Sequence, residues 1–122
     1  MLGDDLADRL LAYAARALNV VSTLPSDPAG KHLGRQLTCS ATSGGANYEE
    51  ARCAESRADF AHKVLVAAKE VSESVYWLRL IQRARLSSST DLVALVAEGR
   101  ELLKILKASA RTARARCRAT DS

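Results

Sequence analysis

Apolar residues recur at steps of three and four along most of the chain, the spacing that places side chains on one face of an α-helix. A first helix is predicted over about residues 4–23, and its acidic first turn suits the positive end of a helix dipole. A second helix is predicted over about residues 28–53, with Pro28 in its first turn and Asp27 as its cap. The apolar face of the first helix is formed by Leu6, Leu10, Tyr13, Ala14, Ala17, Val20 and Val21.

The middle of the second helix allows two interpretations. Residues 40–46 are all small, and the adjacent Gly44 and Gly45 cost on the order of 2 kcal/mol of helix propensity. Either a loop splits the helix here, or the helix continues because a neighbour packs too closely for larger side chains. Ser40 and Gly44 are one turn apart, so a continuous helix would present a flat strip. The pattern alone favours neither interpretation.

The third helix, predicted over about residues 56–85, has the clearest pattern. Ser56 followed by Asp59 resembles a capping box. Its apolar positions alternate between steps of four and three, as in helices that cross at a shallow angle, and they are Phe60, Val64, Ala67, Val71, Ser74, Leu78 and Ile81. A serine-rich break precedes a fourth helix over about residues 90–115, whose apolar face is formed by Leu92, Val96, Gly99, Leu103, Leu106, Ala110 and Ala113.

These four amphipathic helices, joined by short connections, predict an all-α fold. A chain of 122 residues is about one domain long, so residues 1–122 are expected to form a single domain with one hydrophobic core. Strand-like alternation is absent from the sequence. The expected architecture is an antiparallel, up-down-up-down four-helix bundle.

The cysteines, the N-terminal charge and the length of the apolar runs indicate where in the cell the protein is located. Cys39, Cys53 and Cys117 form no CxxC pair, and an odd number of separated thiols is typical of a reducing environment. The N-terminus is acidic where a secretory signal would be basic. Apolar runs such as residues 10–15 are far shorter than the roughly 18 residues that suggest a membrane span. We therefore expect a cytoplasmic protein without a membrane partner.

The net charge of +4 is concentrated in a basic C-terminal tail, residues 104–118. Residues 1–103 hold 12 basic and 13 acidic residues, whereas residues 104–122 hold six basic residues and one acidic residue. Steps of three and four align most of these cations in one stripe beside the apolar face. Such a stripe can neutralise several phosphates of RNA or DNA, but cations near a helix end also complement its dipole and keep a protein soluble. The candidate nucleic-acid-binding residues are Lys104, Lys107, Arg111, Arg114, Arg116 and Arg118.

Catalytic and metal-binding patterns are weak by comparison. Di-iron bundles use two Glu-x-x-His pairs, but the only histidines, His32 and His62, do not follow a glutamate at that spacing. Glu70 and Glu73 are carboxylates on one helix, which can perform acid–base chemistry when burial separates their pKa values. More often such carboxylates bind an arginine from another helix. We therefore predict that the protein is not an enzyme and has no metal or cofactor.

Several segments resemble the four helix bundle protein family, also called the 23S rRNA intervening-sequence protein family. The resemblance covers about residues 10–110 and departs from the family pattern at Gly45, where an apolar residue is usual, and at Tyr48, where an aliphatic residue is usual. It implies a continuous second helix and a ring-shaped homopentamer. The segments that carry it are residues 35–37, 40–51, 59–63 and 68–78.

The resemblance also bears on function. The family has no established activity, but similar basic pentameric barrels that serve diversity-generating retroelements bind nucleic acid and the reverse transcriptase. Six residues at motif positions are best interpreted as a polar network between helices or subunits, because buried polar groups must be paired. These residues are Arg35, Asn47, Glu50, Glu70, Glu73 and Trp77.

Three hypotheses of different classes follow. The first is a non-enzymatic, oligomeric protein that binds RNA or DNA through the basic stripe. The second is a structural adaptor whose ring docks a protein partner and whose charge is incidental. A hydrolase or nuclease that uses Glu70 and Glu73 is the least favoured.

Overall fold

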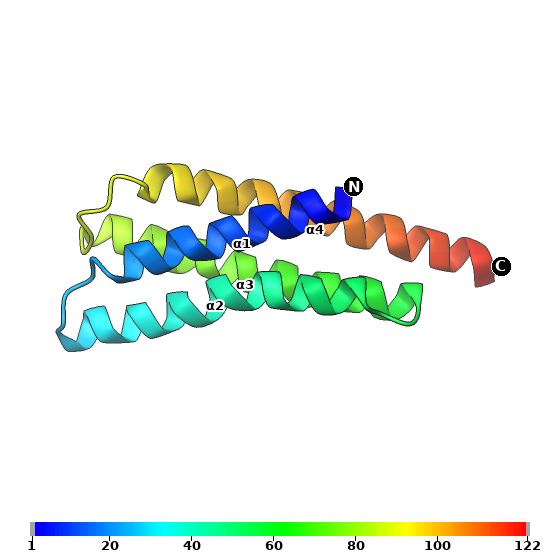
Figure 1. The fold of residues 1–122 in the computed structure, drawn as a ribbon, viewed down its shortest axis with the longest axis horizontal. Helices are drawn as coiled ribbons and strands as arrows, with labels where there is room; N and C mark the ends of the chain where they lie inside the picture. The colour runs from blue at the N-terminus through cyan, green and yellow to red at the C-terminus, as the bar shows by residue number, and fades with distance from the viewer. Residues whose placement is uncertain (1, 122) are drawn as a thin grey trace.

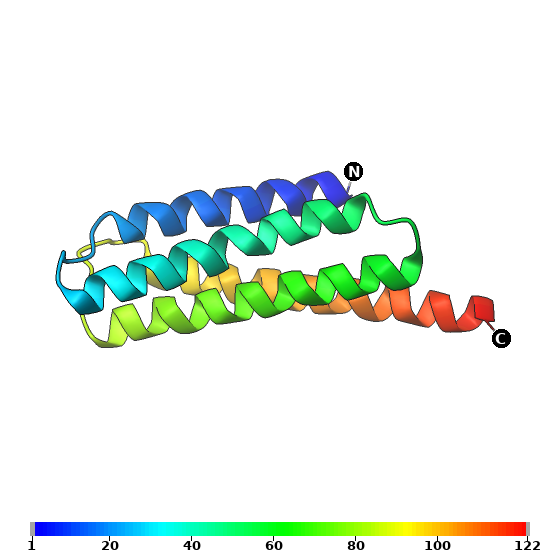
Figure 2. The same ribbon diagram turned by 90° about the horizontal axis from the view of Figure 1, so that it is seen from below.

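The computed structural model describes residues 2–121, which form four α-helices and their connections. Helix α1 spans Leu2–Val21, α2 Pro28–Arg52, α3 Arg57–Arg83 and α4 Leu92–Asp121. The α1–α2 and α3–α4 connections lie at one end of the bundle, and the α2–α3 connection lies at the other (Figure 1). Helix α3 packs extensively against both α2 and α4, whereas α1 lies against α2 and, less closely, α4 (Figure 2). The fold is all-α, as predicted, and the described residues contain no strand.

Seven of the eight helix ends lie within two residues of their predicted positions. The exception is the end of α4, which continues to Asp121 instead of stopping near residue 115. The helix continues beyond the last residue of its apolar pattern because the residues there, among them Arg116, Arg118 and Ala119, are strong helix formers. Among the described residues, no helix combines the length and apolar character that a membrane span requires.

Helix α2 is continuous through Gly44 and Gly45, so the loop interpretation is wrong. Gly44 is buried, and a Cβ atom placed on it would lie 2.7 Å from Val71 Cγ2 of α3. Ser40 is buried on the same strip, and its hydroxyl donates to the Gln36 carbonyl oxygen at 2.9 Å. Close packing of α2 on α3 within one chain therefore explains the glycine at position 44 and offsets its low helix propensity.

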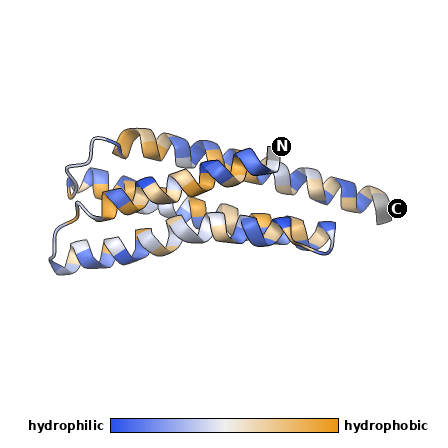
Figure 3. Ribbon diagram, in the orientation of Figure 1, coloured by the Kyte–Doolittle hydropathy of each residue, from blue (hydrophilic) through white to orange (hydrophobic). Residues whose placement is uncertain are grey.

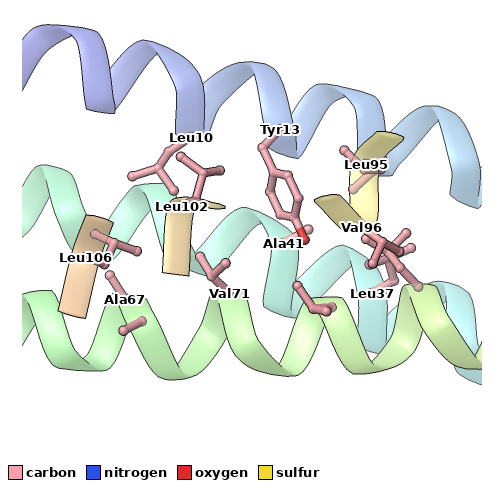
Figure 4. Close-up of a cluster of buried hydrophobic side chains, with 14 of the residues drawn as sticks. Leu10, Tyr13, Leu37, Ala41, Ala67, Val71, Leu95, Val96, Leu102 and Leu106 are labelled. Carbon is pink, nitrogen blue, oxygen red and sulfur yellow. The ribbon is translucent and has the colours of Figure 1, made fainter. Parts of the chain in front are cut away.

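The hydrophobic core runs along the bundle axis, and each helix alternates between hydrophobic and hydrophilic residues as amphipathic helices do (Figures 3 and 4). Tyr13 is fully buried in this core, with its hydroxyl oxygen 2.7 Å from Ser74 Oγ. Because the Ser74 hydroxyl donates to the Val71 carbonyl oxygen at 2.6 Å, Tyr13 is the donor to Ser74. Burial raises the pKa of Tyr13 to about 12. A Cβ atom on Gly99 would lie 2.7 Å from the Tyr13 hydroxyl oxygen, so Gly99 makes room for the ring.

The core face of α4 differs from the predicted face at its centre. Leu102 is fully buried, whereas Leu103, which the apolar pattern places in the core, is only partly buried. Both positions satisfy the helical spacing from Gly99, one at three residues and one at four. The pattern therefore could not separate two adjacent leucines, and only Leu102 is fully buried in the core.

Two arginines connect α1 to α4 and to the residue before it. Arg9 donates two hydrogen bonds to the Glu98 carboxylate, at 2.7 and 3.1 Å. Arg16 donates two to the Asp91 carboxylate, both at 2.8 Å. The hydrogen bond from Arg16 lowers the pKa of Asp91 below its ordinary value. These paired contacts fix the position of the helix that packs least closely.

Candidate nucleic-acid interface

The C-terminal part of α4 carries a row of exposed cations. Only the last turns of this helix extend beyond the α2–α3 connection (Figures 1 and 2). Its apolar residues Leu106, Ala110 and Ala113 are buried, which turns the neighbouring face outward. None of these cations forms an ion pair within the described part of the chain. We call this row the basic stripe; it consists of Lys104, Lys107, Arg111, Arg114 and Arg118, all exposed.

The basic stripe differs from the predicted set of binding residues at two arginines. Arg116 is exposed but lies about 200° around the helix from Arg114, so the structure does not place it on the stripe with the other candidates. Arg100 is exposed one turn before Lys104 and extends the stripe. The four-residue step from Arg100 to Lys104 could have identified Arg100 as a stripe residue. It was missed because Arg100 precedes the basic C-terminal tail, residues 104–118.

Two surface hollows flank this end of α4. The larger, of about 830 Å³, is bordered by Arg57 and Arg116 and opens toward the α2–α3 connection. The smaller, of about 330 Å³, is bordered by His62, Arg114 and Arg118. The smaller hollow therefore shares two arginines with the basic stripe, whereas the larger hollow adds Arg57 and Arg116 but is also lined by Glu55.

Within residues 2–121, a hydrogen bond joins only two of the six residues predicted to form a polar network. The Trp77 indole Nε1 donates to the Glu73 carboxylate at 3.4 Å, within α3. Trp77 also meets His32 of α2 edge-on, with ring centroids 6.1 Å apart. Its side chain is half-buried against the core.

The other four network candidates lie apart. Asn47 donates to the Ser43 carbonyl oxygen of its own helix at 2.8 Å. Arg35 and Glu50 are exposed, and Glu70 is half-buried. In residues 2–121, none of the six forms a hydrogen bond or ion pair with another helix. The network between helices is therefore not found in this chain, and the network between subunits remains a prediction.

The remaining reactive side chains are dispersed. His32, His62, Cys39 and Cys53 are all exposed, and Cys117 is half-buried. Across the part of the chain that the structure describes, no three histidine, cysteine or acidic side chains gather where they could hold a metal ion.

Comparison with known proteins identifies the fold and family. The chain is similar to the crystal structure of a protein with unknown function from the S23 ribosomal protein family of Bacteroides thetaiotaomicron. The two share 32% identity and a TM-score of 0.81, over 91% of this chain and 99% of the other. A comparison with curated proteins finds no match. Residues 7–108 match the description 23S rRNA-intervening sequence protein, a range that stops before most of the basic stripe. This chain belongs to the 23S rRNA-intervening sequence protein family.

Proposed function

We propose that this protein is a non-enzymatic, cytoplasmic binding protein that holds RNA or DNA on the basic stripe of α4. The observation that carries the proposal is the row of exposed cations without carboxylate partners in the described chain. From Lys104 to Arg118 the stripe is about 21 Å long at 1.5 Å per residue. Duplex DNA carries one charge per about 1.7 Å of its axis, so a duplex along the stripe would bring several phosphates within reach.

We also propose that the antiparallel four-helix bundle assembles as a homopentameric ring, as the family resemblance implies. The buried strip around Gly44 is occupied by α3 of the same chain and lends this assembly no support. Support comes instead from apolar side chains that face outward: Leu11 is 70% exposed, Val93 69% and Leu18 43%. Burying such side chains against another copy would remove them from water.

A ring would multiply the charge of the stripe. Five copies of a chain with net charge +4 carry about +20, and a field of that size attracts polyanions from a distance and weakens with salt. The second candidate function is an adaptor that docks a protein. The outward-facing Leu11 and Leu18 of α1 favour it, because the same apolar surface suits a protein partner.

The test compares two variants that lose the same charge. Arg111→Gln with Arg114→Gln removes two cations from the stripe, whereas Lys31→Gln with Lys69→Gln removes two exposed cations from α2 and α3. The ligand is a fluorescently labelled RNA or DNA duplex at low salt, followed by anisotropy. We expect the stripe variant to bind several-fold more weakly and the control variant to bind nearly as the wild type does. Equal losses in the two variants, or no binding by the wild type, would overturn the proposal and favour the adaptor.

A further inference from the structure

A second basic surface lies on the C-terminal part of α3, at the end of the bundle opposite the basic end of α4 (Figure 1). Here a hollow of about 500 Å³ is formed on the outer face of the helix. Its lining contains three arginines, one exposed aromatic ring and no carboxylate. The lining residues are Tyr76, Arg79, Leu80, Gln82, Arg83 and Arg85.

Tyr76 is the aromatic ring of this hollow, and 56% of it is exposed to solvent. It is supported by Trp77, whose ring meets it edge-on with centroids 5.0 Å apart. Trp77 is in turn held by its contact with His32 and by its hydrogen bond to Glu73. The exposed ring therefore packs on a neighbour that itself contacts another helix.

Arg85 occupies an unusual backbone position at the edge of the hollow. Its φ angle of 56° is in the left-handed region that favours glycine. The Leu86 amide donates to the Ile81 carbonyl oxygen and the Arg85 amide to the Gln82 carbonyl oxygen, the pattern of a helix end at which glycine is usual. The chain thus carries a long cationic side chain at a position whose backbone conformation favours glycine, which has no side chain. Such outliers point to a use for the side chain.

The three guanidinium groups have no carboxylate partner in the described chain. Guanidinium groups bind phosphate through two parallel hydrogen bonds, and an aromatic ring stacks on any unpaired base. A duplex hides its bases from such a ring, whereas a single strand offers them. If an apolar protein surface docked on the hollow instead, the three charges would be buried without partners, at a high desolvation cost.

We propose that this hollow binds an unpaired segment of nucleic acid, with one base stacked on Tyr76 and the adjoining phosphates bound by Arg79, Arg83 and Arg85. The proposal rests on the nucleic-acid binding proposed for α4 and adds a second, strand-selective site. The two surfaces lie at opposite ends of the bundle, so one nucleic acid would contact the stripe with its duplex part and the hollow with an unpaired part.

Trp77 is the only tryptophan in the chain, so its fluorescence reports on the neighbouring Tyr76. The full-length protein is titrated with an oligothymidylate and with a blunt-ended duplex that has the same number of phosphates. We expect the single strand to quench Trp77 emission more than the duplex does. Tyr76→Ala should weaken single-strand binding by about fivefold or more, the lower range for loss of a base stack, and leave duplex binding unchanged.

Arg85→Gly separates binding from folding. Glycine relieves the left-handed backbone, so this variant should unfold at a higher urea concentration than the wild type. It should nevertheless lower the salt slope of single-strand binding by about 0.7, the value for one phosphate contact. Lys31→Gln, an exposed position outside the hollow, should leave that slope unchanged.

The outcomes distinguish the two proposals. If neither probe binds the wild type, the function proposed for α4 is wrong and the hollow has no role in it. If both probes bind but Tyr76→Ala and Arg85→Gly keep wild-type affinity and slope for the single strand, the hollow is not a binding site, and the stripe proposal stands.

Discussion

Gly44 and Gly45 are adjacent in α2, yet they meet different neighbours. A Cβ atom on Gly44 would lie 2.7 Å from Val71 Cγ2, a distance that real structures avoid. A Cβ atom on Gly45 would lie 3.5 Å from Leu10 Cβ, an ordinary contact. The family usually has an apolar residue where this chain has Gly45, which agrees with the space available there. Only Gly44 is therefore required for the close approach of α2 and α3.

We predict opposite effects for alanine at these two positions. Gly44→Ala should lower the free energy of unfolding by about 1–3 kcal/mol, because the core must shift to admit a methyl group. Gly45→Ala should raise it by up to about 1 kcal/mol, because alanine has the higher helix propensity. Urea unfolding followed by circular dichroism measures both. Equal effects in the two variants would show that α2 and α3 pack less tightly at Gly44 than the 2.7 Å approach implies.

At the scale of single residues, the sequence predicted most of the basic stripe but not its exact members. The steps of three and four placed Lys104 and Arg118 on one face correctly. Arg116 was a candidate because of its charge, although its position in the sequence already sets it on the other flank. Arg85 could not be identified at all, since its left-handed backbone appears only in the folded helix end.

The helices themselves were predictable because each has an apolar face with helical spacing. The continuity of α2 was not, since it depends on Val71 of another helix packing onto Gly44. Nor were the ion pairs that hold α1, because Arg9 and Glu98 lie 89 positions apart in the sequence. Packing between distant segments therefore settled what periodicity left open.

The contact between Arg16 and Asp91 predicts how the attachment of α1 depends on pH. The pKa of Asp91 is lowered in the folded chain by the hydrogen bond from Arg16. A group with a lowered folded pKa stabilises the fold above its unfolded pKa, about 3.9, and this contribution disappears as pH falls through the folded value. Stability should therefore fall below about pH 4.

Asp91→Asn removes this titrating group, so the free energy of unfolding of the variant should depend less steeply on pH than that of the wild type between about pH 4 and 2. Both side chains are about one-third exposed, at 34% and 39%, so the effect at neutral pH should be small, below about 1 kcal/mol. Urea unfolding at several pH values provides the measurement. A variant with the same acid dependence as the wild type would mean that Asp91 is not paired in solution.

At the scale of the whole molecule, the first expectation concerns assembly. Light scattering should give a mass of about 65 kDa, five times the 13.1 kDa of one chain. Leu11→Glu with Leu18→Glu should dissociate the ring if these exposed residues contact another copy, because the charges would be buried in an apolar contact. A wild-type protein that stays monomeric at tens of micromolar would rule out the ring.

The central claim is that the stripe of α4 binds the phosphates of nucleic acid, and the salt dependence of binding tests it most directly. Affinity for a duplex is measured over a series of salt concentrations for the wild type and for Lys104→Gln, Lys107→Gln, Arg111→Gln, Arg114→Gln combined. These residues are exposed, so helicity and assembly should be unchanged. We expect the slope of log affinity against log salt to flatten by about one unit for each phosphate that the variant no longer neutralises. An unchanged slope in the quadruple variant would contradict the claim, and the stripe would then be only the solvated end of a helix.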